Sequence, residues 1–335
     1  MGKRSGDPTL VLAGDIGGTK THIGLFRMGS HRPEALVVET YLSGEATHLE
    51  GILDRFRESH QMPVASACFG IAGPVYRGMC RTTNLPWFVS ERGIRRRFKW
   101  DHVRLINDLA ATAMAVPLLE IRERTTLNRA KARKGQNIAL LAPGTGLGEA
   151  LLVHQHGDYI PVSSEAGHVD FSPNSEEEID LWRCLRKRFG HVSPERIVSG
   201  PGLVNIYNWL RAGGRYREPQ WLRNRLQDAD PARAITETAL RKGHPLCSET
   251  MRVFLSVFGA VAGNLALTGM ARGGVYLGGG ISPKILPALR QGVFLKAFCD
   301  KGRFSDFMKT IPVRVILNEK APLLGAAACA FRMDI

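Results

Sequence analysis

The residues with the clearest chemical potential form a glycine-rich segment near the start of the chain. Apolar runs at Leu10–Ala13 and Thr21–Phe26 flank it, which predicts two strands joined by a turn. Glycines let backbone N–H groups approach phosphate oxygens, a threonine hydroxyl adds a donor, and a carboxylate at the strand end could hold Mg²⁺ through water. An ordinary tight turn would use the same residues, so both possibilities stay open. The candidate phosphate and cation ligands are Gly14, Asp15, Ile16, Gly17, Gly18 and Thr19.

A second segment repeats this logic in the middle of the chain. The apolar run Asn137–Leu141 leads into Pro143–Gly148, and Ala150–Val153 resumes an extended apolar pattern. This turn contains Thr145 and Gly146, and the first turn contains Gly18 and Thr19, so both turns combine glycine with a threonine. The repeat indicates an internal duplication of one supersecondary unit, in which two hairpins could hold one phosphate chain.

A third glycine run, Gly278, Gly279 and Gly280, follows the short apolar strand Val275–Leu277. It is either a flexible turn or a flat floor for adenine or ribose. None of the three runs is a Walker A loop, because no Gly-Lys-Ser/Thr follows at the required spacing. The first is not a dinucleotide-binding fingerprint either, since a strand rather than a helix comes next.

Polar groups that suit a polyol lie elsewhere in the chain. Asn107 and Asp108 end the strand Val103–Ile106 where a helix is expected to begin, so they are either helix caps or reactive groups. As a reactive group, Asp108 would accept the proton of an attacking hydroxyl. Glu165, His168 and Glu195 add two carboxylates and an imidazole, which match adjacent sugar hydroxyls; a lone His or Glu is more often structural.

Strands alternating with helices predict an α/β fold with layered sheets. Helical signals include Ser175 with capping-box spacing to Glu178, and a long, mostly buried helix at Met251–Thr268. The basic stretch 120–135 is the expected boundary between two domains. Further expected elements are the strand Val64–Ile71, the helix Asp108–Val116, the end of the Ser175 helix near Arg188, and the terminal helix Pro322–Phe331.

Composition limits the functional classes. The chain has 335 residues, 44% of them hydrophobic and 23% charged, which is typical of a globular protein and excludes disorder or a coiled coil. The formal net charge is +14, with basic residues gathered at 92–99 and 129–134. Neither cluster is interleaved with several aromatics, and no nucleic-acid-binding motif accompanies them. A solvated basic surface, and no nucleic-acid partner, is therefore expected.

Cysteine usage and hydropathy address the compartment. The six cysteines are scattered, without a CxxC pair or a Cys/His cluster at metal spacing, which predicts buried thiols in a reducing cytosol. The apolar run Thr9–Ala13 is too short for a signal peptide core, and no segment reaches about 18 uninterrupted apolar residues. A cytoplasmic location without membrane association follows as an expectation.

Taken together, the motifs resemble the bacterial glucokinase family, within the hexokinase, Hsp70 and actin superfamily, over nearly the whole chain. The run Glu195–Gly202 is the most specific part of the resemblance. The other matching segments, in order, are Gly14–Thr19, Gly70–Pro74, Thr83–Trp87, Leu105–Asp108, Gly144–Gly148, Glu165–His168 and Gly278–Lys284.

This resemblance implies a two-domain, actin-like ATPase (ribonuclease H-like) fold with an intervening cleft. Residues 1–118 plus 322–335 would form the small domain and 119–321 the large one. It also implies an ATP-dependent glucokinase of glycolysis, commonly a homodimer, that phosphorylates the 6-hydroxyl of glucose after domain closure expels water. The implied sugar ligands are Asn107, Asp108, Glu165, His168 and Glu195, with Asp108 as general base.

The same resemblance assigns the nucleotide ligands. Asp15 would serve Mg²⁺ through water, and the segments around Gly17, Thr145 and Gly278 would bind the phosphates and adenosine of ATP. Many relatives in the ROK group carry a Cys-rich zinc motif after the sugar-binding His. Here Val169–Pro173 follows His168, and no structural zinc is expected.

Two alternatives remain open at this stage. One is a kinase of another hexose, such as fructose, mannose or an N-acetylhexosamine, because polyol-binding residues look alike. The other is a non-catalytic, sugar-sensing regulator of the ROK type. Such regulators carry a helix-turn-helix before the first hairpin, and only about a dozen residues precede that hairpin here.

Overall fold

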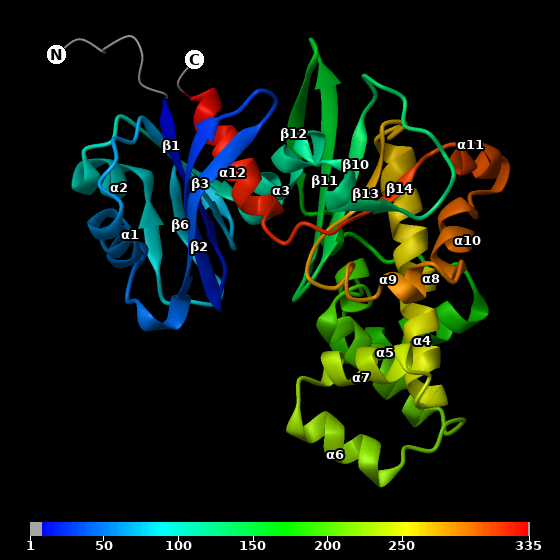
Figure 1. Ribbon diagram of the computed structural model, residues 1–335. Helices are drawn as coiled ribbons and strands as arrows, with labels where there is room; N and C mark the ends of the chain where they lie inside the picture. The colour runs from blue at the N-terminus through cyan, green and yellow to red at the C-terminus, as the bar shows by residue number, and fades with distance from the viewer. Residues whose placement is uncertain (1–8, 334–335) are drawn as a thin grey trace. The chain divides into compact units, whose positions relative to one another are not determined.

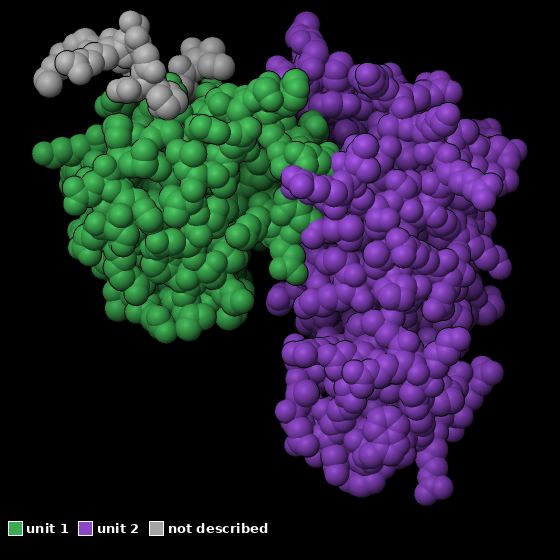
Figure 2. All heavy atoms as spheres, in the orientation of Figure 1, with its two compact units in different colours: residues 1–120, 318–335 green, residues 121–317 purple. Residues whose placement is uncertain are grey.

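The computed structural model describes residues 9–333, and these divide into two compact units (Figure 2). Unit 1 comprises residues 1–120 and 318–335, and unit 2 comprises residues 121–317. Unit 1 is therefore assembled from both ends of the chain. The domain boundaries proposed from the sequence, 118/119 and 321/322, lie within a few residues of these limits and stay a prediction about folding domains.

Unit 1 is built on a five-stranded sheet with the order β3-β2-β1-β4-β8. β1, β2 and β3 form an antiparallel meander, and β4 and β8 continue the sheet parallel to β1. The strands span Leu10–Ile16 (β1), Lys20–Met28 (β2), Pro33–Leu42 (β3), Ser66–Ile71 (β4) and His102–Asn107 (β8).

Both faces of this sheet are covered, because β1 carries apolar side chains on each side. Leu10, Leu12 and Ile16 join a core with α1 (Leu49–Ser59) and α2 (Glu91–Phe98). Val11 and Ala13 face α12 (Ala321–Arg332), which also packs against α3 (Asp108–Ala115). A three-stranded sheet of Val75–Tyr76 (β5), Met79–Arg81 (β6) and Phe88–Ser90 (β7) completes the unit.

The crossing of α12 and α3 is unusually close. A Cβ added to Gly325 of α12 would overlap the carbonyl oxygen of Ala111 and would lie 3.0 Å from the backbone nitrogen of Ala115. Only glycine leaves room for this backbone-to-backbone approach. Because α3 begins at Asp108, the contact fixes the helix that carries that carboxylate.

Unit 2 repeats the sheet of unit 1. Its order is β12-β11-β10-β13-β14-β9: an antiparallel meander of three strands followed by two parallel strands, with β9 added antiparallel at the edge (Figure 1). This shared topology supports the internal duplication predicted from the two glycine turns. The strands span Arg124–Thr126 (β9), Ile138–Pro143 (β10), Leu147–Gln155 (β11), Asp158–Ser164 (β12), Gly274–Leu277 (β13) and Val313–Ile316 (β14).

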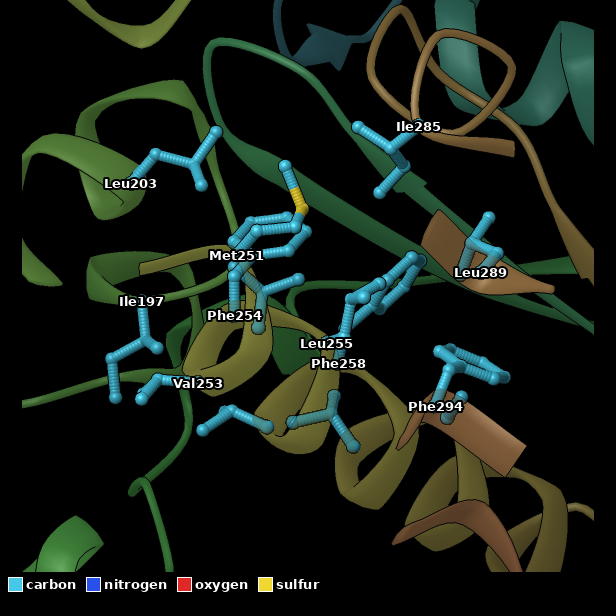
Figure 3. Packing of buried hydrophobic residues seen from close by; sticks show 14 of the residues in the cluster. Ile197, Leu203, Met251, Val253, Phe254, Leu255, Phe258, Ile285, Leu289 and Phe294 are labelled. Atoms are coloured by element: carbon cyan, nitrogen blue, oxygen red, sulfur yellow. The ribbon is translucent and has the colours of Figure 1, made fainter. Parts of the chain in front are cut away.

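Helices bury one face of this second sheet. Figure 3 shows Met251, Phe254 and Phe258 of α8 in the same apolar cluster as Phe294 of α10. Burying each such side chain contributes about 1.5–3 kcal/mol. The helices are Glu176–Phe189 (α4), Gly200–Ala212 (α5), Gln220–Asp228 (α6), Pro231–Leu240 (α7), Pro245–Thr268 (α8), Leu286–Leu289 (α9), Val293–Cys299 (α10) and Ser305–Lys309 (α11).

The helix α8 is long and apolar enough, by length and composition, to cross a membrane. Most of its most apolar stretch is buried inside unit 2, however, and the core helix of a globular protein passes the same test. Its apolar side chains already have partners in the cluster of Figure 3. The helix is therefore accounted for by the core of unit 2.

Several expectations from the sequence need correction. The first turn does not begin at Gly14, because β1 continues to Ile16; a Cβ at Gly14 would lie 2.5 Å from the Phe69 ring. The stretch 120–135 is not only a boundary, since it contains β9. Of the six cysteines expected to be buried, Cys184 is exposed and Cys299 is half-buried. The helix expected at Met251 begins earlier, at Pro245.

Candidate active site

The first glycine turn joins β1 to β2 through Gly17, Gly18 and Thr19. The N–H of Gly17 donates to the carbonyl of Lys20 at 3.0 Å, which closes the turn. A short 3₁₀ turn supports it from behind, because the Ser43 hydroxyl donates to the Gly17 carbonyl at 2.8 Å. A Cβ at Gly18 would lie 2.8 Å from the Cβ of Asn84, so this glycine is needed for packing.

Asp15 and Asp108 form an acidic pair at the end of the unit 1 sheet. Asp15 is the penultimate residue of β1, and Asp108 follows β8 directly. Burial and then the nearby Asp108 charge raise the pKa of the Asp15 carboxyl to about 7. Burial also raises the pKa of Asp108, although hydrogen bonds from backbone N–H groups oppose this. Such an uncompensated pair attracts either a proton or a cation.

Asn107 is the N-cap of α3, as the helix-cap interpretation predicted. Its Oδ1 accepts from the N–H of Leu109 at 2.9 Å, and its Nδ2 donates to the carbonyl of Gly73 at 3.1 Å. Asp108 also accepts from Leu109 through Oδ1, at 2.8 Å. Capping does not exclude chemistry, because Asp108 presents a second carboxylate oxygen, Oδ2, besides the one that accepts from Leu109.

In unit 2 the second glycine turn joins β10 to β11 through Gly144, Thr145 and Gly146. The N–H of Gly144 donates to the carbonyl of Gly146 at 2.8 Å, and the N–H of Gly200, at the start of α5, donates to the carbonyl of Gly144 at 2.8 Å. The turn is thus supported from behind by the start of a helix.

Glu195 connects this turn to the candidate sugar ligands. Its Oε2 accepts from the N–H of Leu147 at 3.0 Å, and its Oε1 lies 3.8 Å from Nδ1 of His168. A backbone hydrogen bond also positions His168, since its N–H donates to the carbonyl of Glu165 at 2.9 Å. The structure therefore brings together the second turn, Glu165, His168 and Glu195, although the last two are 27 positions apart in the sequence.

The third glycine run lies against the second turn. The N–H of Gly278 donates to the carbonyl of Leu141 at 2.8 Å, and that of Ile281 donates to Pro143 at 3.2 Å. Gly279 has a φ of +71°, and a Cβ there would overlap the Pro143 carbonyl. Both facts require glycine at this position.

The predicted site residues divide between the units. The first cluster, in unit 1, contains Asp15, Gly17–Thr19, Asn107 and Asp108. The second cluster, in unit 2, contains Gly144–Gly146, Glu165, His168, Glu195 and Gly278–Gly280. Gly14 and Ile16, also predicted as ligands, lie within β1 with buried side-chain environments. The two described surface hollows, one at Arg211 to Arg223 and one at His48 to Arg97, contain none of these residues.

Sequence reasoning missed three polar residues near these clusters. Ser43 supports the first turn, and His191 contacts the main chain of His168. Glu149 lies on β11, just after the second turn, with its side chain buried. The sequence offered one usable signal, namely that Glu149 follows the glycine run directly in an otherwise apolar strand.

Glu149 should make the stability of unit 2 depend on pH. The residue is only 3% exposed, its Oε1 has no hydrogen-bond partner among the described residues, and burial raises its pKa to about 7. A carboxyl that binds its proton more tightly when folded stabilises the fold at low pH. That contribution is lost as the pH rises from about 4.5 through about 7.

We therefore expect Glu149→Gln to raise the free energy of unfolding relative to the parent chain at pH 8, by at most about 3 kcal/mol, and much less at pH 4.5. Thermal unfolding followed by circular dichroism across this pH range measures the difference. Glu58→Gln, at an exposed glutamate of α1, is the matched control. A difference between the Glu149 variant and the parent that does not grow with pH would show that Glu149 is already ionised in the fold.

The acidic pair of unit 1 fits a hydrated Mg²⁺ ion. No hydrogen bond or ion pair among the described residues engages the Asp15 carboxylate, and its raised pKa reflects burial beside a second carboxyl. Mg²⁺ typically uses one or two carboxylates and keeps several waters, so two acidic residues suffice. No group of three or more His, Cys, Asp or Glu side chains that could hold a metal occurs within residues 9–333.

Comparison with known proteins gives one consistent result. A family model described as Glucokinase matches residues 12–333. A glucokinase of Synechocystis sp. is 40% identical, over 95% of this chain and 97% of that protein. A glucokinase of Yersinia pestis is 37% identical, over 96% of each chain.

Solved structures agree with the sequence relatives. The crystal structure of glucokinase from an Antarctic psychrotroph superposes with a TM-score of 0.87 at 30% identity, covering 97% of this chain and all of that one. A ROK family glucokinase from Streptomyces griseus, solved in complex with glucose and AMPPNP, gives a TM-score of 0.62 at 21% identity over 97% of this chain and 100% of its own. At that identity the second likeness supports the fold alone.

Proposed function

The chain belongs to the glucokinase family, and from that membership we propose how its residues move the γ-phosphoryl group of ATP to the 6-hydroxyl of D-glucose. It is an ATP-dependent hexose kinase with an actin-like ATPase fold. The observation that carries the residue-level proposal is the position of Asp108, at the start of α3 and beside Asp15.

In the proposed reaction, Asp108 is the general base. Its raised pKa makes it a stronger proton acceptor than an exposed aspartate, and its Oδ2 is left to receive the hydroxyl proton. Asn107 would hold a neighbouring hydroxyl with its side-chain amide, which also interacts with the Asp108 carboxyl. The attacking oxygen is thus oriented and deprotonated while the γ-phosphoryl group is transferred, and no covalent intermediate is needed.

The glycine turns supply backbone donors for the phosphates. Gly17, Gly18 and Thr19 serve from unit 1, and Thr145 and Gly146 serve from unit 2. Glycine at these positions keeps side chains away from the phosphate oxygens, and the threonine hydroxyls add donors. The segment Gly278–Gly280 is assigned to the adenosine, because its close approach to Pro143 keeps it beside the second turn.

The second cluster also contributes the remaining sugar ligands. Glu165 and Glu195 accept from adjacent hydroxyls, and His168 provides an imidazole near Glu195. Because the same Glu195 carboxylate also holds the N–H of Leu147, sugar binding and the shape of the phosphate turn depend on one residue.

Mg²⁺ would be held by Asp15 through water, with Asp108 adding negative charge nearby. When bound, the ion neutralises charge on the transferring phosphoryl group. Four further assignments rest on the family resemblance and the sequence: a cytoplasmic location, a homodimer, no structural zinc and no nucleic-acid partner.

A coupled assay across a panel of sugars and phosphoryl donors tests this function. We expect the highest kcat/KM with glucose and ATP, lower values with fructose, mannose and N-acetylhexosamines, and no turnover once Mg²⁺ is removed by a chelator. If kcat/KM is higher for another hexose, that hexose and not glucose is the preferred substrate. Sustained turnover in the chelator would remove Mg²⁺ from the proposal, and DNA binding in a gel shift without any kinase activity would favour a regulator.

A further inference from the structure

His191 contacts the main chain of a proposed sugar ligand from a different segment. Its Nε2 lies 3.0 Å from the carbonyl oxygen of His168, and its Nδ1 lies 3.4 Å from Oδ1 of Asp170. A carbonyl oxygen can only accept, so Nε2 carries a proton and donates it. The imidazole of His191 therefore donates a hydrogen bond to the main chain of the segment that carries His168.

A backbone hydrogen bond joins the same two segments next to the contact between His191 and the His168 carbonyl. The N–H of Phe171 donates to the carbonyl of Val192 at 2.9 Å, and both side chains are buried. The backbone pair fixes one end of the contact in the core. His191 contacts the stretch just before Phe171, where His168 and Asp170 are exposed, whereas Gly167 before them is buried close to the backbone of Leu147.

From this geometry we propose that His191 is a positioning residue for sugar binding. It restrains the peptide that follows His168, and so keeps the His168 imidazole beside the Glu195 carboxylate, 3.8 Å away. No hydrogen bond or ion pair among the described residues joins His191 to the second glycine turn. The inference rests on the proposed sugar-binding role of His168.

The position of His191 predicts a selective effect. Its side chain is 56% exposed, so removing it leaves no cavity in the core and costs little stability. Loss of the hydrogen bond instead lets the His168 segment move. The free-energy cost of ordering this segment when the sugar binds is then higher. The KM for glucose should rise while kcat and the KM for ATP stay nearly constant.

The experiment compares His191→Ala with His191→Gln in the full chain. His191→Ala is expected to raise the KM for glucose about 3- to 10-fold, the loss that one hydrogen bond produces. His191→Gln keeps an N–H near the position of Nε2 and should recover a KM within about 2-fold of the parent. His31→Ala, at an exposed histidine of unit 1, is the control and should leave every parameter unchanged.

A double-mutant cycle tests whether His191 acts through His168. If it does, His191→Ala adds no further loss of glucose affinity in a His168→Ala background. Additive losses, failure of Gln to rescue, or an equal fall in kcat and both KM values with a lower Tm would overturn the positioning role. If His168→Ala alone leaves the KM for glucose unchanged, the proposed sugar contact of His168 fails as well. If the KM for glucose rises in His168→Ala but not in His191→Ala, only the positioning role of His191 is overturned.

Discussion

Asp108→Asn is expected to lower kcat by about 10²-fold or more, the range that general bases contribute. The amide cannot accept the hydroxyl proton, but its Oδ1 still accepts the N–H of Leu109, so α3 should start at the same residue. Steady-state assays with glucose and ATP measure kcat, and both KM values should change only a few-fold. The variant also removes the charge that raises the pKa of Asp15.

The matched control is Asp101→Asn, at the exposed residue before β8. Asp101 and Asp108 flank the two ends of β8, so both variants remove one negative charge next to the same strand. The control should leave kcat within about 2-fold of the parent, since surface changes away from the chemistry have small effects. Near-normal turnover in Asp108→Asn would assign the general base to another group. A lower Tm in that variant would instead point to a structural role.

Gly325→Val should produce the largest loss of stability in unit 1. The added side chain would overlap the backbone of Ala111, so α12 and α3 would have to separate. Overpacking of this kind costs about 3 kcal/mol, and because no flexible side chain can give way here we expect at least that. For a protein of this size the Tm should fall by about 6 °C or more. Activity should fall too, since α3 carries Asp108.

Urea unfolding and thermal melts measure this loss, and Gly44→Val is the control. Gly44 is exposed, and a Cβ there would meet no atom within 4 Å, so its replacement should cost less than about 0.5 kcal/mol. Hydrogen exchange should be faster in α12 and α3 of Gly325→Val than in the parent. Unchanged stability would mean that the two helices can move apart freely.

Local patterns predicted the central strands and several helices well. β1, β4 and β10 are buried on both faces, so each appears in the sequence as a mainly apolar run, whereas β8 alternates exposed His102 and Arg104 with buried Val103 and Leu105. The N-cap at Ser175 was also correct, since its side chain accepts from the N–H of Glu178 at 3.2 Å. The Glu178 carboxylate, however, accepts from Asn174, one residue before the expected partner.

Other elements could not be predicted from local patterns. Most side chains of β3 are exposed or half-buried, so its sequence lacks an apolar period. α5 begins with Gly200-Pro201-Gly202, which looks like a turn, but Ser199 caps it and a Cβ at Gly202 would overlap the Ile197 carbonyl. The close approach of the Ile197 backbone, rather than helix propensity, explains Gly202.

The sequence predicted which residues could form the candidate site, but not how those residues contact one another. The glycine turns and the pair Asn107-Asp108 carry signals within a few residues of sequence. The link between Glu195 and Leu147, by contrast, depends on contacts between distant segments. The raised pKa of Asp15 also comes from burial and from Asp108, neither of which is visible in the order of residues.

The two-ended construction of unit 1 has a consequence for synthesis on the ribosome. Residues 121–317 are continuous, so unit 2 can fold as soon as that stretch has emerged. Unit 1 cannot, because Val11 and Cys68 share a cluster with Leu323 and Ala327, and Ser66 donates to the Ala330 carbonyl. Its β-sheet lacks the helix that packs against Val11 and Ala13 until α12 has been made. During that interval the nascent protein should be most in need of a chaperone.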